Sequence, residues 1–406
     1  MTMIEKMNQA EEYVLHTYNR FPVVFEKGEG VCLYDTEGKE YLDFAAGIAV
    51  NALGYHYPGY DEALKAQIDK LLHVSNLYYN VPIAEAGEKL VKASGLEKVF
   101  FTNSGTEAIE GALKAAKKYA YIRDGHSGHE IIAMNHSFHG RTIGALSVTG
   151  NAHYRDPFAP LMDGVKFADF NDINSVKEKI TEKTCAILLE PVQGEGGIFS
   201  AEQDFLDELR QICDEKDILL IFDEIQCGMG RTGNYFAWQA YGIKPDIMTC
   251  AKALGCGVPV GAFVLGKKAA KASLAPGDHG TTYGGNPFVC AAVSRVFDIF
   301  EKDEILKHVQ EHILFLEDAL DRLAANHDCV LERRGMGFMQ GLVLKKEYPV
   351  GEVVKKALDE GLLVISAGEN VLRIVPPLII RKEDILKMEE ILNKCFVYDG
   401  LRKTDG

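Results

Sequence analysis

The chain has 406 residues, with 44 Lys and Arg against 59 Asp and Glu, a net charge of −15 and 47% apolar residues. These globular proportions exclude a disordered chain, a collagen and a small disulfide scaffold, and a chain beyond about 300 residues usually forms more than one domain. The negative charge repels nucleic acid and anionic lipid over most of the surface, so we expect neither a nucleic-acid nor a membrane partner.

The N-terminus and the cysteines indicate a cytoplasmic protein. Residues 1–20 mix charged and apolar side chains and lack the uninterrupted apolar stretch of a secretory signal. The nine cysteines are scattered without a C-x-x-C pair, which favours reduced, buried thiols over a disulfide or zinc framework. We therefore expect no metal site.

The middle of the chain alternates short apolar strands with helices. Such alternation is typical of an α/β fold in which helices cover both faces of a mostly parallel sheet. The expected strands are 98–103, 130–134, 165–169, 185–190, 217–222 and 246–250, and the expected helices begin at Thr106 or span 174–179 and 204–213.

The tail has a different pattern, with helices 305–325, 353–358 and 384–394 among strands 329–335, 338–344, 362–365 and 372–375. This mixture indicates a smaller α+β domain. Strand-like segments 31–38 and 39–46 have no helix of their own and are expected to pack on that tail. The prediction is a large domain of residues 51–297 and a small domain formed by 1–50 and 298–406.

A helix start after the strand at residue 98 is a candidate phosphate site. Ser104 and Glu107 have the spacing of a capping box, and Gly105 allows a ligand to approach the free N–H groups of the first turn. An ordinary capped helix would have the same local sequence, so this motif alone does not decide between the two.

Two charged side chains directly follow other apolar strands. Asp223 comes after 217–222, where its carboxylate would hold a cation or a protonated ring nitrogen. Lys252 comes after 246–250 and precedes a glycine-rich turn, where burial would lower its pKa and favour a Schiff base. The alternatives are a solvated loop acid and a surface lysine.

Three further motifs are weaker. Residues 228–233 fit G-x-G-x-x-G, but the acid that should end the next strand, Asp246, begins it. A dinucleotide-dependent dehydrogenase is therefore the less favoured reading from a different class. Residues 261–268 resemble a P-loop but lack its final Ser or Thr, and His136 and His139 have no third metal ligand in view.

The three stronger sites together match the needs of one cofactor. Pyridoxal 5'-phosphate requires an anchor for its phosphate, a carboxylate at its ring nitrogen and a lysine for its aldehyde. The carboxyl ends of parallel strands meet at one edge of a sheet, so all three sites are expected to lie together.

Longer motifs carry a family resemblance. FTNSGTEAIEGALKAA, SFHGRTIGALSVTG, LEPVQGEGG, IFDEIQCGMGRTG, AKALGCGVPVGA, TTYGGNP and LRIVPPL resemble the class III pyridoxal-phosphate aminotransferases, which have the aspartate-aminotransferase-like fold, called PLP fold type I. The resemblance implies catalytic roles for Lys252 and Asp223. It also implies cofactor contacts from Ser104, Gly105 and Thr106 at the phosphate, Phe138 and Ile225 on the ring faces, Gln226 at the ring hydroxyl, and Thr282 across a homodimer interface.

The resemblance extends to the substrates. It implies that Arg141 and Arg373 bind carboxylates, that Glu195 covers Arg373 while the amine donor reacts, and that Tyr18 and Thr281 are further contacts. The implied reaction moves the terminal amino group of N2-acetylornithine to 2-oxoglutarate, giving N-acetylglutamate 5-semialdehyde and glutamate in arginine biosynthesis. Aminotransferases that act on 4-aminobutyrate, ornithine or succinylornithine share these motifs, so these alternatives stay open, and a related decarboxylase or aminomutase is a further alternative.

Overall fold

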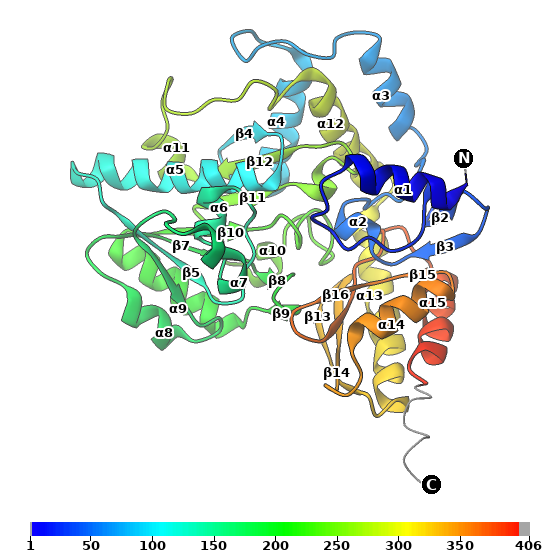
Figure 1. Cartoon of the computed structure of the whole chain (residues 1–406). Coiled ribbons are helices and arrows are strands. Elements are labelled where there is room, and N and C mark those ends of the chain that lie inside the picture. Colours follow the sequence, from blue (N-terminus) through cyan, green and yellow to red (C-terminus); the bar gives the residue numbers. More distant parts are fainter. Residues whose placement is uncertain (1, 398–406) are drawn as a thin grey trace.

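A computed structural model describes residues 2–397 of the chain. Its central feature is a seven-stranded sheet in the order β4 (Lys98–Thr102), β12 (Gly261–Leu265), β11 (Ile247–Cys250), β10 (Leu219–Asp223), β7 (Thr184–Leu189), β5 (Glu130–Met134) and β6 (Val165–Ala168). Figure 1 shows this sheet and its helices as one part of the molecule, beside a second part formed mainly by the C-terminal third.

Alternate side chains of each strand enter different layers of the core. Ile131 and Ala133 pack in one apolar cluster with the alanine stripe of α5 (Gly105–Asp124). Ile132 and Met134 pack in another, with residues from α8 (Ile173–Lys179) and α9 (Gln203–Lys216). Because both faces are covered, the strands consist of almost continuous apolar runs. The α/β fold with a mostly parallel sheet is thus confirmed.

One strand of this sheet departs from the parallel pattern. β12 lies antiparallel between β4 and β11, with Gly261 opposite Thr102 and Cys250 opposite Ala262. Residues 261–268 are therefore a buried strand followed by α11 (Lys267–Lys271), and not a phosphate loop. The carboxyl ends of β4 and β11 still lie at the same edge, because β12 reverses direction between them.

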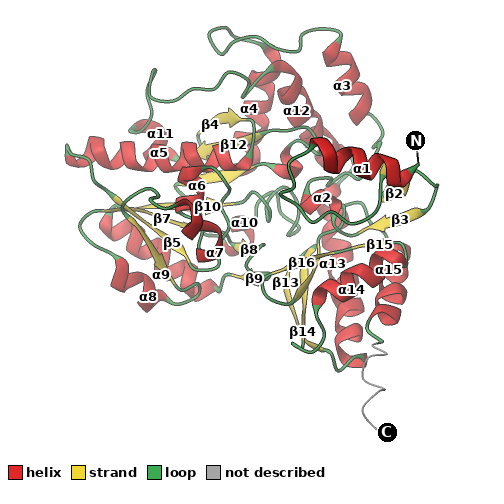
Figure 2. Ribbon diagram, in the orientation of Figure 1, coloured by secondary structure: helices red, strands yellow, loops and turns green. Residues whose placement is uncertain are grey.

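The second part contains two small sheets. One has the order β13 (Val330–Met336), β14 (Met339–Leu344), β17 (Val371–Ile374) and β16 (Ile365–Ala367). In the other, β1 (Phe25–Glu29), β2 (Cys32–Asp35) and β3 (Glu40–Asp43) join β15 (Leu362–Leu363), so the N-terminal strands pair with the tail. The accompanying helices, seen in Figure 2, are α13 (Ile305–Asn326), α14 (Val350–Asp359) and α15 (Lys382–Cys395).

Helices near the N-terminus and beside the β4 edge of the main sheet complete the fold. They are α1 (Met3–Tyr13), α2 (Ala46–Ala49), α3 (Tyr60–Ile68), α4 (Val81–Ser94) and α12 (Pro287–Lys302). Short helices α6 (Ile143–Ser147), α7 (Ala152–Arg155) and α10 (Trp238–Tyr241) and the two-stranded hairpin of β8 (Val192–Gln193) and β9 (Phe199–Ser200) lie near the main sheet. The domain division at residues 50/51 and 297/298 stays a prediction; its second boundary falls inside α12, and residues 1 and 398–406 lie outside the described residues.

Within residues 2–397, no helix combines the length and the apolar character needed to cross a lipid bilayer. The cytoplasmic location expected from the sequence stays a prediction.

Candidate active site

A cavity of about 500 Å³ lies at the edge where β4, β5, β7, β10 and β11 end. It is the location at which open α/β sheets bind their ligands. Its walls include every predicted cofactor-binding residue except Thr282, and one predicted substrate residue, Arg141. The former are Ser104, Gly105, Thr106, Phe138, Asp223, Ile225, Gln226 and Lys252.

Asp223 is the last residue of β10 and is held as a buried carboxylate. Oδ1 accepts hydrogen bonds from the backbone N–H of Ile225 (3.0 Å) and from the Thr249 hydroxyl (3.2 Å). Oδ2 lies 2.7 Å from Nδ1 of His139, which is itself buried. These partners fix both oxygens, so the carboxylate is oriented before any ligand arrives.

Lys252 lies two residues beyond β11 at the start of a single 3₁₀ turn. Its backbone has φ of 48°, a left-handed conformation that is costly for a side chain with a Cβ and is found mainly where function requires it. Burial lowers the pKa of the Lys252 amine to about 8. A much larger share of the amine is therefore neutral and nucleophilic near neutral pH than for an exposed lysine.

The N-terminus of α5 forms another wall. Ser104 caps the helix by accepting a hydrogen bond from the Glu107 N–H (3.3 Å), whereas the Glu107 carboxylate accepts from Asn103 N (2.6 Å) instead of closing a capping box on Ser104. A Cβ at Gly105 would lie 2.9 Å from Cδ1 of Ile225, so glycine lets Ile225 pack directly on the first turn. The free N–H groups and the helix dipole favour an anion here.

Arg141 is held at the cavity by aromatic rings. Its guanidinium carbon lies 3.8 Å from the ring centroid of Tyr154 and 5.3 Å from that of Phe138. The sequence did not single out Tyr154 as a site residue, because Tyr154 is in α7, thirteen positions after Arg141, which lies in the loop before α6. These cation–π contacts hold the guanidinium at the cavity, and its planar donors suit a carboxylate.

Glu195 and Arg373 form a bidentate ion pair next to the cavity. Arg373 Nη1 lies 2.6 Å from Oε1 of Glu195, and Nη2 lies 3.3 Å from Oε2. Arg373 Nη1 also donates to Oε1 of Gln226 (3.1 Å), so the pair contacts a residue of the cavity wall. Arg373 is on β17 and Glu195 is in the β8–β9 hairpin, and the fold brings them together as the sequence predicted only by resemblance.

The remaining predicted residues lie outside the cavity of the single chain. Tyr18 has 71% of its surface exposed, and Thr282 is also exposed. Thr281 contacts the cavity indirectly, because its hydroxyl accepts a hydrogen bond from Nδ2 of Asn103 (3.2 Å), and Asn103 lines the cavity.

Two buried residues of the site were missed as functional residues. His139 was weighed only as a metal ligand, and Glu190 was not weighed at all. Glu190 follows β7 and accepts hydrogen bonds from the N–H groups of Phe138 (3.1 Å) and Gly194 (3.3 Å), and burial raises its pKa to about 7. Glu190 directly follows an apolar strand, and this position in the sequence could have indicated it as a site residue.

The glycine motif at 228–233 has a structural role. It forms a run of turns between β10 and the four-residue helix α10, so the long helix of a dinucleotide site does not follow it. Arg231 in its centre is fully buried and donates hydrogen bonds to the carbonyl oxygens of Phe338 (3.4 Å) and Pro376. The motif thus attaches the main sheet to the C-terminal part.

The residues of the cavity fit pyridoxal phosphate. They supply an anion-binding helix start for the phosphate, an oriented carboxylate for the ring nitrogen and an amine of low pKa for the aldehyde. Among the described residues that line the cavity, no other group of side chains supplies all three. His139 Nε2 is buried and has no hydrogen-bond partner among these residues, so the hydrogen-bonding contact of the ring is the one between Nδ1 and Asp223.

A family model described as Aminotransferase class-III matches residues 13–396. The chain belongs to the class III aminotransferases. This aminotransferase is 47% identical to the acetylornithine aminotransferase of Methanocaldococcus jannaschii, over 95% of its own length and 96% of that protein. The dehydrogenase reading is thereby excluded.

Solved structures of the family have the same fold. Similarity to the ornithine aminotransferase of Toxoplasma gondii, which holds pyridoxal phosphate at partial occupancy in its active site, has a TM-score of 0.93 at 30% identity and covers 97% of this chain and 94% of that one. For the N-acetylornithine aminotransferase of Stenotrophomonas maltophilia the TM-score is 0.82 at 36% identity, with 96% and 98% covered. The predicted fold of this aminotransferase is confirmed.

Proposed function

We propose that this aminotransferase uses pyridoxal 5'-phosphate to move the terminal amino group of N2-acetylornithine to 2-oxoglutarate. The reaction gives N-acetylglutamate 5-semialdehyde and glutamate. The choice of amine donor is supported by relatives that are named acetylornithine aminotransferase and are 43–47% identical over nearly the whole chain.

The single observation that supports the cofactor is the meeting of Lys252, Asp223 and the start of α5 in one cavity. Lys252 would hold the aldehyde carbon, Asp223 the ring nitrogen, and the N–H groups of Gly105 and Thr106 the phosphate. When bound, the cofactor supplies an electron sink for the carbon that loses its proton.

The protein side chains perform the proton transfers and the charge stabilisation. Lys252 has a pKa of about 8, which suits a group that takes a proton from the amine-bearing carbon of the substrate and returns it elsewhere in the same site. The Asp223 carboxylate would face the ring nitrogen in a fixed orientation, because the Ile225 N–H, the Thr249 hydroxyl and the His139 ring contact its two oxygens.

The two arginines distinguish the substrates. Arg141 would bind the carboxylate next to the acylated amine, which leaves the terminal amine of N2-acetylornithine facing Lys252. Arg373 is neutralised by Glu195 while this donor, which has a single carboxylate, reacts. 2-Oxoglutarate has two carboxylates, so its second one would displace Glu195 and pair with Arg373.

A homodimer completes the site in this proposal. Thr282 is exposed and lies outside the cavity of its own chain. The segment that contains Thr282 is in contact with the loop of residues 75–80, because Asn76 Nδ2 donates a hydrogen bond to the Gly284 carbonyl oxygen (2.9 Å). The same face exposes Leu77, Tyr79 and Tyr283. A second copy on this face would cover these apolar side chains and place Thr282 at the neighbouring cofactor site.

A spectral titration tests the proposed donor. Purified protein would be titrated under one set of conditions with N-acetylornithine, ornithine, succinylornithine and 4-aminobutyrate while the visible band of the bound cofactor is followed. We expect N-acetylornithine to convert the band at the lowest concentration. If another amine converts it better, the donor assignment is wrong and the reaction class stands; if Lys252→Ala retains full turnover, the reaction class is wrong as well.

A further inference from the structure

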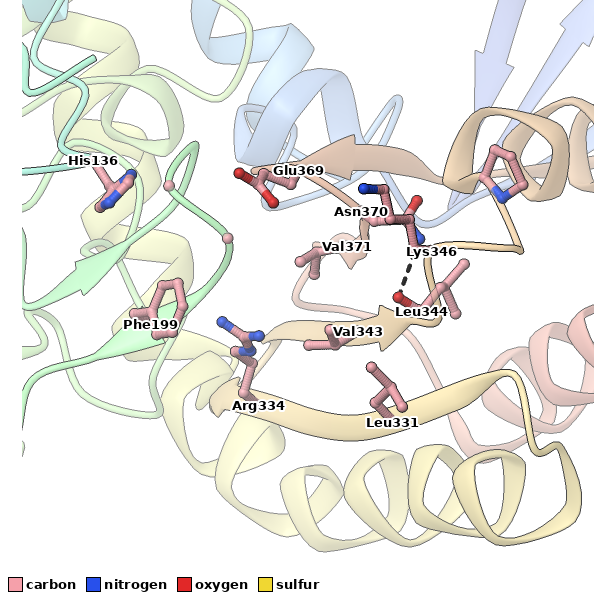
Figure 3. A pocket seen from close by; sticks show the side chains of 13 residues that line it. His136, Phe199, Leu331, Arg334, Val343, Leu344, Lys346, Glu369, Asn370 and Val371 are labelled. Atoms are coloured by element: carbon pink, nitrogen blue, oxygen red, sulfur yellow. Dashed lines mark hydrogen bonds between the residues drawn. The ribbon is translucent and has the colours of Figure 1, made fainter. Parts of the chain in front are cut away.

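A second cavity, of about 590 Å³, lies between the β8–β9 hairpin and the C-terminal sheet. Among residues 2–397 it shares no lining residue with the active-site cavity. Figure 3 shows His136 and Phe199 on one side and side chains of β13, β14 and β17 on the other. The cavity therefore bridges the two parts of the molecule without belonging to the cofactor site.

Both sides of this cavity carry exposed apolar side chains. Leu331 has 60% of its surface exposed and Phe199 has 41%, although both are large hydrophobic residues on strands. Leu331 is the extra residue of a register shift between Val330 and Glu332 in the pairing with β14. Val343 and Val371 lie on the same side as Leu331, opposite Phe199, so both sides present hydrocarbon to a ligand.

The rim of the cavity carries charges of both signs. Arg334 lies with its guanidinium carbon 4.0 Å from the ring centroid of Phe199 and pairs through Nη2 with Oε1 of Glu332 (2.8 Å). Its Nε and Nη1 are buried and have no hydrogen-bond partner among the described residues. Lys346 and Glu369 also line the cavity, and within residues 2–397 neither side chain forms an ion pair.

These charges determine the ligand class. Arg334, Lys346 and Glu369 line the cavity, and Arg334 is paired with Glu332 beside it, so a purely anionic or purely cationic ligand would meet charge of its own sign as well as of the opposite sign. Figure 3 shows the guanidinium of Arg334 and the carboxylate of Glu369 on opposite sides of the opening, with Val371 between them. A ligand with a carboxylate, an ammonium and a hydrocarbon chain satisfies all three surfaces.

We propose that this cavity is a binding site for a free amino acid with an aliphatic side chain. Its carboxylate would pair with the guanidinium of Arg334, its ammonium with Glu369, and its chain would cover Leu331 and Val343. Burying the exposed hydrocarbon of both partners supplies the non-directional part of the affinity, and the two ion pairs supply the orientation.

The site is connected to the gating pair by the backbone. Gly196 and Gly197 line the cavity and directly follow Glu195, whose carbonyl oxygen accepts a hydrogen bond from Gly368 N (2.8 Å). Glu369, the next residue, is the ammonium partner. A ligand that bridges the hairpin and the C-terminal sheet would stabilise the arrangement in which Glu195 covers Arg373, and by linkage it would weaken the binding of a dicarboxylate at Arg373. This consequence rests on the proposed function, whereas the binding itself does not.

Calorimetry of the holoenzyme with L-norleucine tests the binding. Hexanoate lacks the ammonium and pentylamine lacks the carboxylate, so each tests one charge. We expect one norleucine per chain, binding at least about tenfold tighter than either analogue, as expected for charge-assisted hydrogen bonds. Arg334→Gln and Glu369→Gln should each weaken norleucine about tenfold, while Lys345→Gln, at an exposed neighbour that does not line the cavity, should leave it unchanged.

A second pair of variants leaves the charges in place. Leu331→Trp fills the cavity from an exposed position and should abolish the norleucine heat, whereas Leu314→Trp, at a leucine on α13 that is 69% exposed, should not. The visible band of the cofactor, followed in parallel, separates binding in the cavity from reaction at the active site. Absence of heat, or heat that survives Arg334→Gln and Leu331→Trp, overturns the site; hexanoate binding as tightly as norleucine overturns the amino-acid assignment.

Kinetics test the coupling separately. Norleucine should raise the KM for 2-oxoglutarate severalfold in the wild type and not in Leu331→Trp, with the KM for the amine donor unchanged. An unchanged KM for 2-oxoglutarate together with normal calorimetric binding overturns the coupling alone. A different preferred amine donor would overturn the proposed function and leave the calorimetric result intact.

Discussion

Neutralising Glu195 is expected to shift the enzyme toward dicarboxylic substrates. Arg373 is 3% exposed and Glu195 is 28% exposed, and two hydrogen bonds of 2.6 and 3.3 Å join them. A pair that is buried on one side only is worth about 1–2 kcal/mol, between the values of surface and buried pairs. 2-Oxoglutarate must break this pair before its second carboxylate reaches Arg373, so the pair opposes its binding by that amount.

Glu195→Gln keeps the shape and removes the charge. The KM for 2-oxoglutarate should therefore fall about five- to thirtyfold, the factor that corresponds to 1–2 kcal/mol. Single-turnover rates with glutamate and with the amine donor should show the same preference for glutamate, because glutamate also has two carboxylates. Glu202→Gln, at an exposed acid near the same hairpin, is the matched control and should change neither. An unchanged or higher KM for 2-oxoglutarate in Glu195→Gln would refute the role of the pair as a gate.

Three other predictions concern the cofactor site and the assembly. The pKa of Lys252 is about 8 in the folded protein, below the ordinary 10.5, so its buried charge lowers the stability fully below pH 8 and not at all above pH 10.5. In urea titrations of the cofactor-free protein, Lys252→Met should therefore raise the free energy of unfolding by about 1–3 kcal/mol at pH 7 and by less at pH 9.5. Equal gains at both pH values would contradict the burial of the charge. His139→Asn removes the ring that orients Asp223 and should lower kcat about ten- to a hundredfold with a pH profile shifted relative to the wild type; an unshifted profile at full kcat would show that His139 is only packing. Tyr79→Asp adds a charge to a fully exposed ring on the proposed dimer face and should halve the mass measured by light scattering, whereas Leu314→Asp should not; a monomeric wild type would refute the interface.

The local features of the fold were predictable because each depends on neighbours in the sequence. The apolar runs that became β5, β7, β10 and β11 needed only their composition, and the Ser104 cap on Glu107 needed only a three-residue spacing. The same rule applies to α1, which the sequence analysis overlooked. Thr2 and Glu5 form a complete capping box there, and the T-x-x-E signal was present.

Other features of the site depend on contacts between residues far apart in the sequence, and no local pattern encodes these contacts. His139 meets Asp223 across 84 positions of sequence. Glu195 meets Arg373 across 178 positions, and only the family resemblance indicated it. The antiparallel β12 has the same apolar composition as its parallel neighbours, so its direction follows from the chain connections and not from its residues.

Lys252 and Asp223 were the exceptions, because the geometry of a parallel sheet converts a local fact into a long-range one. Asp223 ends the buried strand β10 and Lys252 lies two residues beyond β11, and these adjacent parallel strands must end at the same edge. Twenty-nine positions of sequence separate the two residues, yet their meeting required no knowledge of loops or helices. Residues that follow a parallel strand by three or more positions, such as His139 after β5, lose this constraint because the loop decides their direction. In this fold, therefore, the position of a site residue can be predicted from the sequence when only a few residues separate it from the end of the strand that places it.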